Sequence, residues 1–149
     1  KGDKMKYKWY LIIVVVIIVF FSIKYFNDYR EKGLDDVINY DISNFESLVF
    51  YEGIEGFEWK TDKKEHAEEF KDFLSQYRVK RMKDVEWNSD VSKEKGFSVS
   101  IYSQGKPIPI MASIYEKRIL FVNEGKYYKV INEQIDIDWV ENYITEHPN

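Results

Sequence analysis

The chain contains no cysteine, only two histidines and only three prolines. The absence of cysteine excludes disulfide bonds, thiolate metal ligands, a cysteine nucleophile and a lipid-modified cysteine. We expect His66 to be a packing residue on a helix and His147 to lie in a frayed C-terminus. With no second partner for either, the sequence predicts neither a histidine-based triad nor a histidine-rich metal site, and no cofactor.

Glycine motifs that bind phosphate or support a nucleophile are also missing: no G-x-S-x-G, P-loop or G-x-G-x-x-G occurs. Acidic residues outnumber basic ones over most of the chain. Residues 1–32 carry a net charge of +4, which leaves −8 for the remainder of a chain whose total is −4. Nucleic-acid binding needs concentrated positive charge on the folded part, so the sequence predicts no nucleic-acid partner.

One long hydrophobic run stands near the start. Every residue from Leu11 to Phe21 is Leu, Ile, Val or Phe. As a helix, Trp9 to Phe26 extends about 27 Å, close to the hydrocarbon thickness of a bilayer. Strands rarely exceed about ten residues, which disfavours the alternative of a buried strand. The run therefore predicts a transmembrane helix, with the lipid bilayer as a partner through residues 9–26.

The sequence predicts that the anchor is not cleaved and that its N-terminal end stays in the cytoplasm. No A-x-A-like cleavage pattern follows the run. Lys4, Lys6 and Lys8 precede it, which favours a cytoplasmic N-terminus and a single pass through the cell membrane. The predicted division is a short cytoplasmic N-terminus (1–8), the anchor (9–26), a juxtamembrane helix end and tether (27–43), and an extracytoplasmic domain (44–149).

The domain mixes strand and helix patterns. Alternation of apolar and polar residues predicts strands at 47–51, 57–60, 97–102, 108–114, 118–122 and 126–131, and a last helix after Asp136 or Asp138. Gly125 is available for positive φ in the final hairpin. The layout predicts an α+β fold: an antiparallel sheet with two helices packed on one face.

The clearest helix is predicted over 62–77. Its apolar residues fall within one arc of the helical wheel; these are Ala67, Phe70, Phe73, Leu74 and Tyr77. Asp62 and Glu65 have the spacing of a capping box, with Thr61 as an alternative cap.

Each of two clusters of acidic residues has a plain structural interpretation and a functional one. The first comprises Glu65, Glu68, Glu69 and Asp72, which indicate a solvated helix face or, alternatively, a catalytic carboxylate pair. The second comprises Asp136, Asp138 and Glu141, which indicate helix capping and first-turn charges or, alternatively, cation ligands. We favour the plain interpretation of both, and so expect no metal site.

The stretch YRVKRMK is the only basic cluster in the acidic domain. Its cations are Arg78, Lys80, Arg81 and Lys83, which suit a helix end or contact with lipid, wall polymer or an acidic partner. Pro107 and Pro109 indicate a sheet edge. We expect an envelope protein partner to meet that edge at Tyr102, Met111 and Tyr115, steered by the basic cluster.

The Lys/Ile/Asn/Tyr-rich texture and the GKYYKV-then-helix ending resemble small membrane-anchored extracytoplasmic α+β proteins of Bacillus-type, Gram-positive bacteria. Without a catalytic motif, we expect a non-enzymatic binding or regulatory module, such as an accessory, inhibitor or immunity-type protein. The alternatives are a cell-wall-directed hydrolase or metal-assisted enzyme that uses carboxylates, and a structural tether.

Overall fold

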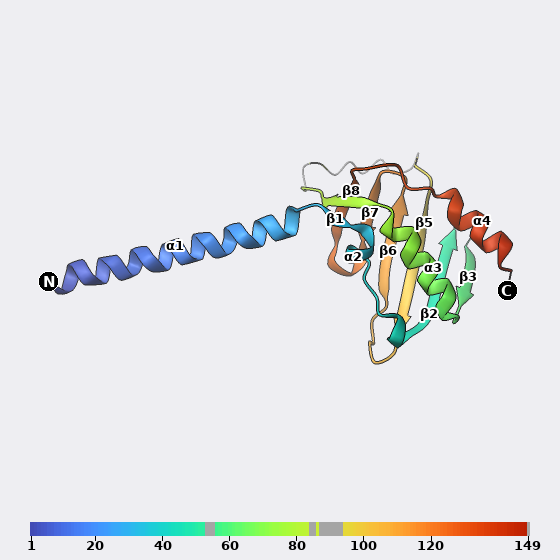
Figure 1. The fold of residues 1–149 in the computed structure, drawn as a ribbon, viewed down its shortest axis with the longest axis horizontal. Coiled ribbons are helices and arrows are strands. Elements are labelled where there is room, and N and C mark those ends of the chain that lie inside the picture. Colours follow the sequence, from blue (N-terminus) through green and yellow to red (C-terminus); the bar gives the residue numbers. More distant parts are fainter. Residues whose placement is uncertain (53–55, 84–85, 87–93, 149) are drawn as a thin grey trace. The chain divides into compact units, whose positions relative to one another are not determined.

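The computed structural model describes residues 1–52, 56–83, 86 and 94–148 (Figure 1). The chain divides into two compact units, Lys1–Arg30 and Glu31–Asn149. The first unit is a single helix, α1 (Gly2–Tyr29), with no buried residue. Its most apolar 18-residue window has a mean hydropathy of 2.4, and it is the one helix in the described part of the chain that is long and apolar enough to cross a membrane.

The second unit is an α+β domain, as predicted. Its described strands form one antiparallel sheet of eight in the order β1-β4-β8-β7-β6-β5-β2-β3. The strands are β1 (Lys32–Gly33), β2 (Phe45–Glu52), β3 (Phe57–Thr61), β4 (Arg78–Arg81), β5 (Gly96–Ser103), β6 (Ile110–Tyr115), β7 (Arg118–Phe121) and β8 (Lys126–Val130). The helices are α2 (Leu34–Val37), α3 (Lys64–Ser75) and α4 (Asp138–Glu146), with short 3-10 turns η1 (Ile42–Asn44) and η3 (Val122–Glu124). Helices α2, α3 and α4 lie on the same face of the sheet (Figure 1).

The core lies between that face and the helices. Phe50 of β2 is fully buried at its centre. The Phe50 ring lies 5.0 Å from that of Phe70 on α3, 5.5 Å from that of Trp59 and 5.8 Å from that of Phe97, measured between centroids. Trp139 of α4 extends the cluster. Four residues of the arc predicted from the sequence are confirmed as part of the buried side of α3, namely Ala67, Phe70, Phe73 and Leu74, whereas Tyr77 is buried beyond the end of the helix.

The segment predicted as a tether belongs to the domain. Leu34, Ile38 and Tyr40 are buried in the core. The Tyr40 hydroxyl donates a hydrogen bond to the Ala67 carbonyl at 2.6 Å, and the Leu34 amide donates to the Tyr77 carbonyl at 2.9 Å. The prediction was wrong because a four-residue helix is too short to display a period in the sequence.

The predicted sheet edge is an interior strand. β6 lies between β5 and β7, and the outermost strands are β1 and β3. Pro107 and Pro109 precede β6, where no strand partner requires their missing amide hydrogen. The Asn123 side chain replaces regular pairing there, because it donates to the Pro109 carbonyl at 2.8 Å and accepts from the Met111 amide at 2.7 Å. Gly125 adopts positive φ (61°), as predicted.

The basic cluster is not the end of a helix. α3 ends at Ser75, and Arg78–Arg81 form β4. The predicted capping box is also absent: Lys63 occupies the N-cap position without a side-chain cap, and the Thr61 hydroxyl accepts a hydrogen bond from the Lys63 amide at 3.2 Å. Arg78, Lys80 and Arg81 are therefore strand residues with fixed neighbours across the sheet, and Lys83 lies beyond the strand.

Candidate functional site

One face of the sheet carries no helix in the described part of the domain. Antiparallel sheets commonly pack one face on a core and leave the other solvated. On β5, Phe97, Val99 and Ile101 point into the core, so the residues that alternate with them point the other way. We call this side the open face; by the same alternation it comprises Ser47, Val49, Tyr51, Glu58, Lys60, Arg78, Lys80, Ser98, Ser100, Tyr102, Met111, Ser113, Tyr115, Arg118, Leu120, Tyr127 and Lys129.

The middle of the open face is lined by tyrosines and serines. Tyr102 is 38% exposed, and Met111 and Tyr115 are half-buried on the neighbouring strand. Ser98 and Ser113 lie opposite each other with their hydroxyl oxygens 3.2 Å apart. The structure therefore places the three apolar contact residues expected from the sequence on one side of two adjacent strands, although not at an edge.

Gly96 makes room for one of these rings. It pairs with Tyr115 across β5 and β6. A Cβ atom at Gly96 would lie 2.6 Å from Cδ1 of Tyr115 and 2.8 Å from the Ile114 carbonyl oxygen. Any side chain at this position would therefore have to displace the tyrosine from the strand surface.

Cations occupy the other side of the open face. In the strand register Lys80 of β4 lies opposite Lys129 of β8, and Lys129 lies opposite Arg118 of β7. Like charges directly opposite one another destabilise a sheet. Two glutamates offset them: Glu86 pairs with Lys129 at 2.9 Å, and Glu94 pairs with Arg118 at 2.6 Å. The hydrogen bond from Lys129 is the largest cause that lowers the pKa of Glu86.

The four predicted steering cations are therefore divided. Arg78 and Lys80 lie on the open face, and Arg78 is paired with Glu31 at 3.0 Å. Arg81 points to the opposite side of β4, in register with the buried Tyr128. Lys83 lies in the connection beyond the strand and is exposed. β8 and β7 separate β4 from β6, so the cluster is not beside the prolines.

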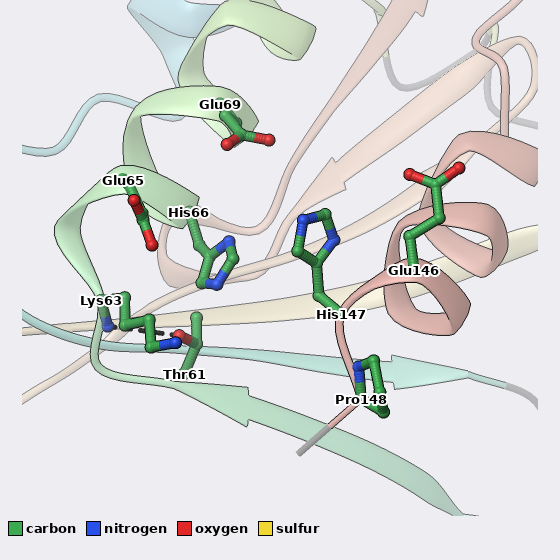
Figure 2. A pocket seen from close by; sticks show the side chains of 8 residues that line it. All are labelled: Thr61, Lys63, Glu65, His66, Glu69, Glu146, His147 and Pro148. Atoms are coloured by element: carbon green, nitrogen blue, oxygen red, sulfur yellow. Dashed lines mark hydrogen bonds between the residues drawn. The ribbon is translucent and has the colours of Figure 1, made fainter.

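A second feature is a hollow of about 390 Å³ where the start of α3 meets the end of α4 (Figure 2). In Figure 2 the rings of His66 and His147 face each other beside it, and Glu146 extends away from them. The lining residues are Thr61, Lys63, Glu65, His66, Glu69, Glu146, His147 and Pro148.

His66 is buried on α3 as a packing residue, as predicted, but the two histidines form one cluster with Tyr143, which the sequence did not predict. Nδ1 of His66 is hydrogen-bonded to the Tyr143 hydroxyl, and the two imidazole rings lie 5.0 Å apart between centroids. His147 is held rather than frayed. Its ring stacks on that of Tyr143 at 4.3 Å, its Nδ1 donates to the Tyr143 carbonyl at 2.9 Å, and its own carbonyl accepts from Nε1 of Trp59 at 2.8 Å.

These contacts attach the end of α4 to the start of α3 and to β3. The Tyr143 pKa is raised by burial first and then by the Glu69 and Glu65 carboxylates, which disfavours a reactive phenolate. Among the described residues, no three His, Cys, Asp or Glu side chains are placed to hold a metal ion. Asp138 and Glu141 lie in the first turn of α4, whose N-cap is Ile137 rather than Asp136.

The lowered pKa of His66 predicts that the domain loses stability in mild acid. Burial first, and then the charge of His147, lower the His66 pKa, while Glu65 and Glu69 act in the opposite direction. The unfolded chain therefore binds more protons than the folded one just below pH 6.5. The stabilisation is complete above that pH and is lost as the pH falls through the lower, folded pKa.

We expect the free energy of unfolding to decrease between pH 7.5 and pH 5, and the decrease to be smaller in His66→Gln. Tyrosine near-ultraviolet circular dichroism of the full chain during denaturant unfolding measures it. Glu52, whose pKa is raised by burial first, is present in both proteins and cancels in the comparison. Equal slopes for the two proteins would contradict the assignment.

Comparison with known proteins adds no assignment. No protein-family model matches the chain, and no curated protein or solved structure is significantly similar to it. The resemblance to anchored proteins of Bacillus-type bacteria therefore remains a prediction from the sequence. The open face and the histidine hollow are the two surface features from which a function is to be inferred.

Proposed function

We propose that the protein is a membrane-anchored, extracytoplasmic binding module that acts without catalysis. The hydropathy and length of α1 support the anchor. The excess of lysine before the span, at Lys4, Lys6 and Lys8, supports a cytoplasmic N-terminus and an outward-facing domain in the cell membrane. In this arrangement the domain meets its partner at the outer surface of the bilayer.

The observation that carries the proposal is the middle of the open face. Tyr102, Met111 and Tyr115 form a surface of half-exposed, adaptable apolar side chains on rigid strands. Tyrosine combines a large apolar ring with a polar end and loses little conformational entropy, which is why it is enriched at protein interfaces. The half-buried Ser98 and Ser113, whose hydroxyls are hydrogen-bonded to each other, lie on the same face. A protein partner of the envelope fits this chemistry.

The histidine hollow supports an enzyme less well. An acid–base pair needs two groups that converge on a substrate. His66 and His147 each use Nδ1 within the fold, and both rings pack against Tyr143. These contacts account for the two histidines as the attachment of α4, without a reaction.

We expect the double variant Tyr102→Ser, Met111→Ser to lose the partner. The full chain, carried in native membranes and solubilised mildly, is recovered with its cross-linked partner and compared with the variant by mass. Phe57→Ser is the matched control, because Phe57 is 50% exposed on the other side of edge strand β3. Partner recovery that is equal in the double variant and the wild type would refute the open face as the binding surface.

A further inference from the structure

The row of cations on the open face is unusual for a stable sheet. Lys80, Lys129 and Arg118 are direct neighbours across three adjacent strands. Lys80 is exposed, and the structure gives it no ion pair with any described residue. Like charges in register cost stability unless counter-charges are supplied. Glu94 and Glu86 supply a counter-charge to Arg118 and Lys129, so Lys80 is the cation of the row that calls for a further anionic group.

The chain itself indicates which anion fits. Both counter-charges, Glu86 and Glu94, come from the connection between β4 and β5 and reach across 43 and 24 positions of sequence to their partners. The Arg118–Glu94 pair is largely buried, with 14% and 18% of the side chains exposed, whereas Lys129 and Glu86 are 42% and 34% exposed. Two carboxylates of the chain itself thus already pair with the row, Glu94 in a largely buried ion pair and Glu86 in a more exposed one.

Apolar side chains adjoin the row. Leu120 lies opposite Tyr127 on the same two strands, two positions along from Arg118 and Lys129, and both are half-buried. A phosphate polymer offers no side chain to contact them. An acidic polypeptide carries both carboxylates and apolar side chains, and so matches the whole surface.

We propose that this row, Lys80, Lys129 and Arg118, is the docking site for an acidic polypeptide segment of the partner. Its carboxylates bind Lys80 and compete with Glu86 for Lys129, while Arg118 stays paired with Glu94 as a fixed support. The proposal rests on the proposed function, since it specifies the partner chemistry of the same open face. Glu86 acts as an internal competitor that weakens binding.

The probe is a fluorescein-labelled octapeptide of alternating Glu and Tyr, with the Gln/Tyr peptide as its neutral counterpart. Fluorescence anisotropy measures binding to the full chain in nanodiscs of uncharged lipid, at low and high salt. We expect Lys80→Gln, Lys129→Gln to weaken binding about tenfold at low salt, as two exposed ion pairs allow. Glu86→Gln should strengthen it about threefold.

Lys64→Gln, Lys106→Gln removes the same charge from exposed positions outside the row, and should leave binding unchanged. The proposal is overturned if the wild type does not bind the peptide, if the row variant binds as well as the control, or if Glu86→Gln binds more weakly. Stronger binding of inorganic polyphosphate than of the peptide overturns it as well, in favour of a phosphate polymer. None of these results alters partner recovery by the Tyr102→Ser, Met111→Ser variant, which tests the proposed function separately.

Discussion

Replacing Phe50 by alanine is expected to destabilise the domain by about 3–5 kcal/mol, the cost typical of a fully buried phenylalanine. Phe50 is 0% exposed and contacts the rings of Phe70, Trp59 and Phe97. The variant loses the apolar contacts of its own ring and leaves a cavity that three other rings line. Because domains of this size are stable by about 5–15 kcal/mol, a large part of the total is lost.

Denaturant unfolding of the full chain, followed by near-ultraviolet circular dichroism, measures this loss. Phe57→Ala is the control on the adjacent strand, since Phe57 is 50% exposed and should cost no more than about 0.5 kcal/mol. If the two alanine variants are equally stable, the core is not centred on Phe50.

The double substitution Ile17→Arg, Ile18→Arg is expected to release the protein from the membrane. Each arginine at the centre of a span costs about 2.5–3.5 kcal/mol, and each isoleucine contributes about −0.5 kcal/mol, so insertion becomes less favourable by about 6–8 kcal/mol. The hydrophobic run from Leu11 to Phe21 contributes only about −3 to −7 kcal/mol by the same scale.

Carbonate-washed membranes measure the outcome. The wild type and the control Ile17→Leu, Ile18→Leu should remain in the pellet, and the arginine variant should appear in the soluble fraction. Retention of the arginine variant in the pellet would show that α1 is not what anchors the protein.

Local patterns in the sequence were sufficient for the elements whose chemistry is local. The apolar run predicts α1, the arc of Ala67, Phe70, Phe73 and Leu74 predicts α3, and Gly125 predicts a positive-φ turn, and each is confirmed. Period-2 alternation also predicted the strands that correspond to β5 and β6, and Tyr102, Met111 and Tyr115 share a face of these two strands.

The predictions that were wrong concern features that depend on contacts between residues far apart in the sequence. His66 and Tyr143 are 77 positions apart, and no local pattern indicates that the end of α4 returns to the start of α3. β1 has only two residues and α2 only four, too few for a period to appear. Two residues separate the end of α3 from β4, which lies within reach of the helix predicted over 62–77, and so the sequence placed its cations at a helix end. Pro107 and Pro109 have no amide hydrogen, which predicts a sheet edge. In the structure they precede the interior strand β6, and the distant Asn123 side chain bonds the Pro109 carbonyl and the Met111 amide there.

The absence of cysteine permits the most direct test of the central claim, that the open face of an outward-facing domain is occupied by a protein partner. A single cysteine at Tyr102 and, separately, one at the exposed Glu68 of α3 can be labelled in intact cells with a membrane-impermeant maleimide. We predict that Glu68→Cys is labelled at once, whereas Tyr102→Cys is labelled slowly in cells but rapidly in purified, partner-free protein. Equal labelling rates of Tyr102→Cys in cells and in the purified protein would contradict occupation of the face, and failure of both variants to label until the cells are lysed would contradict the outward orientation.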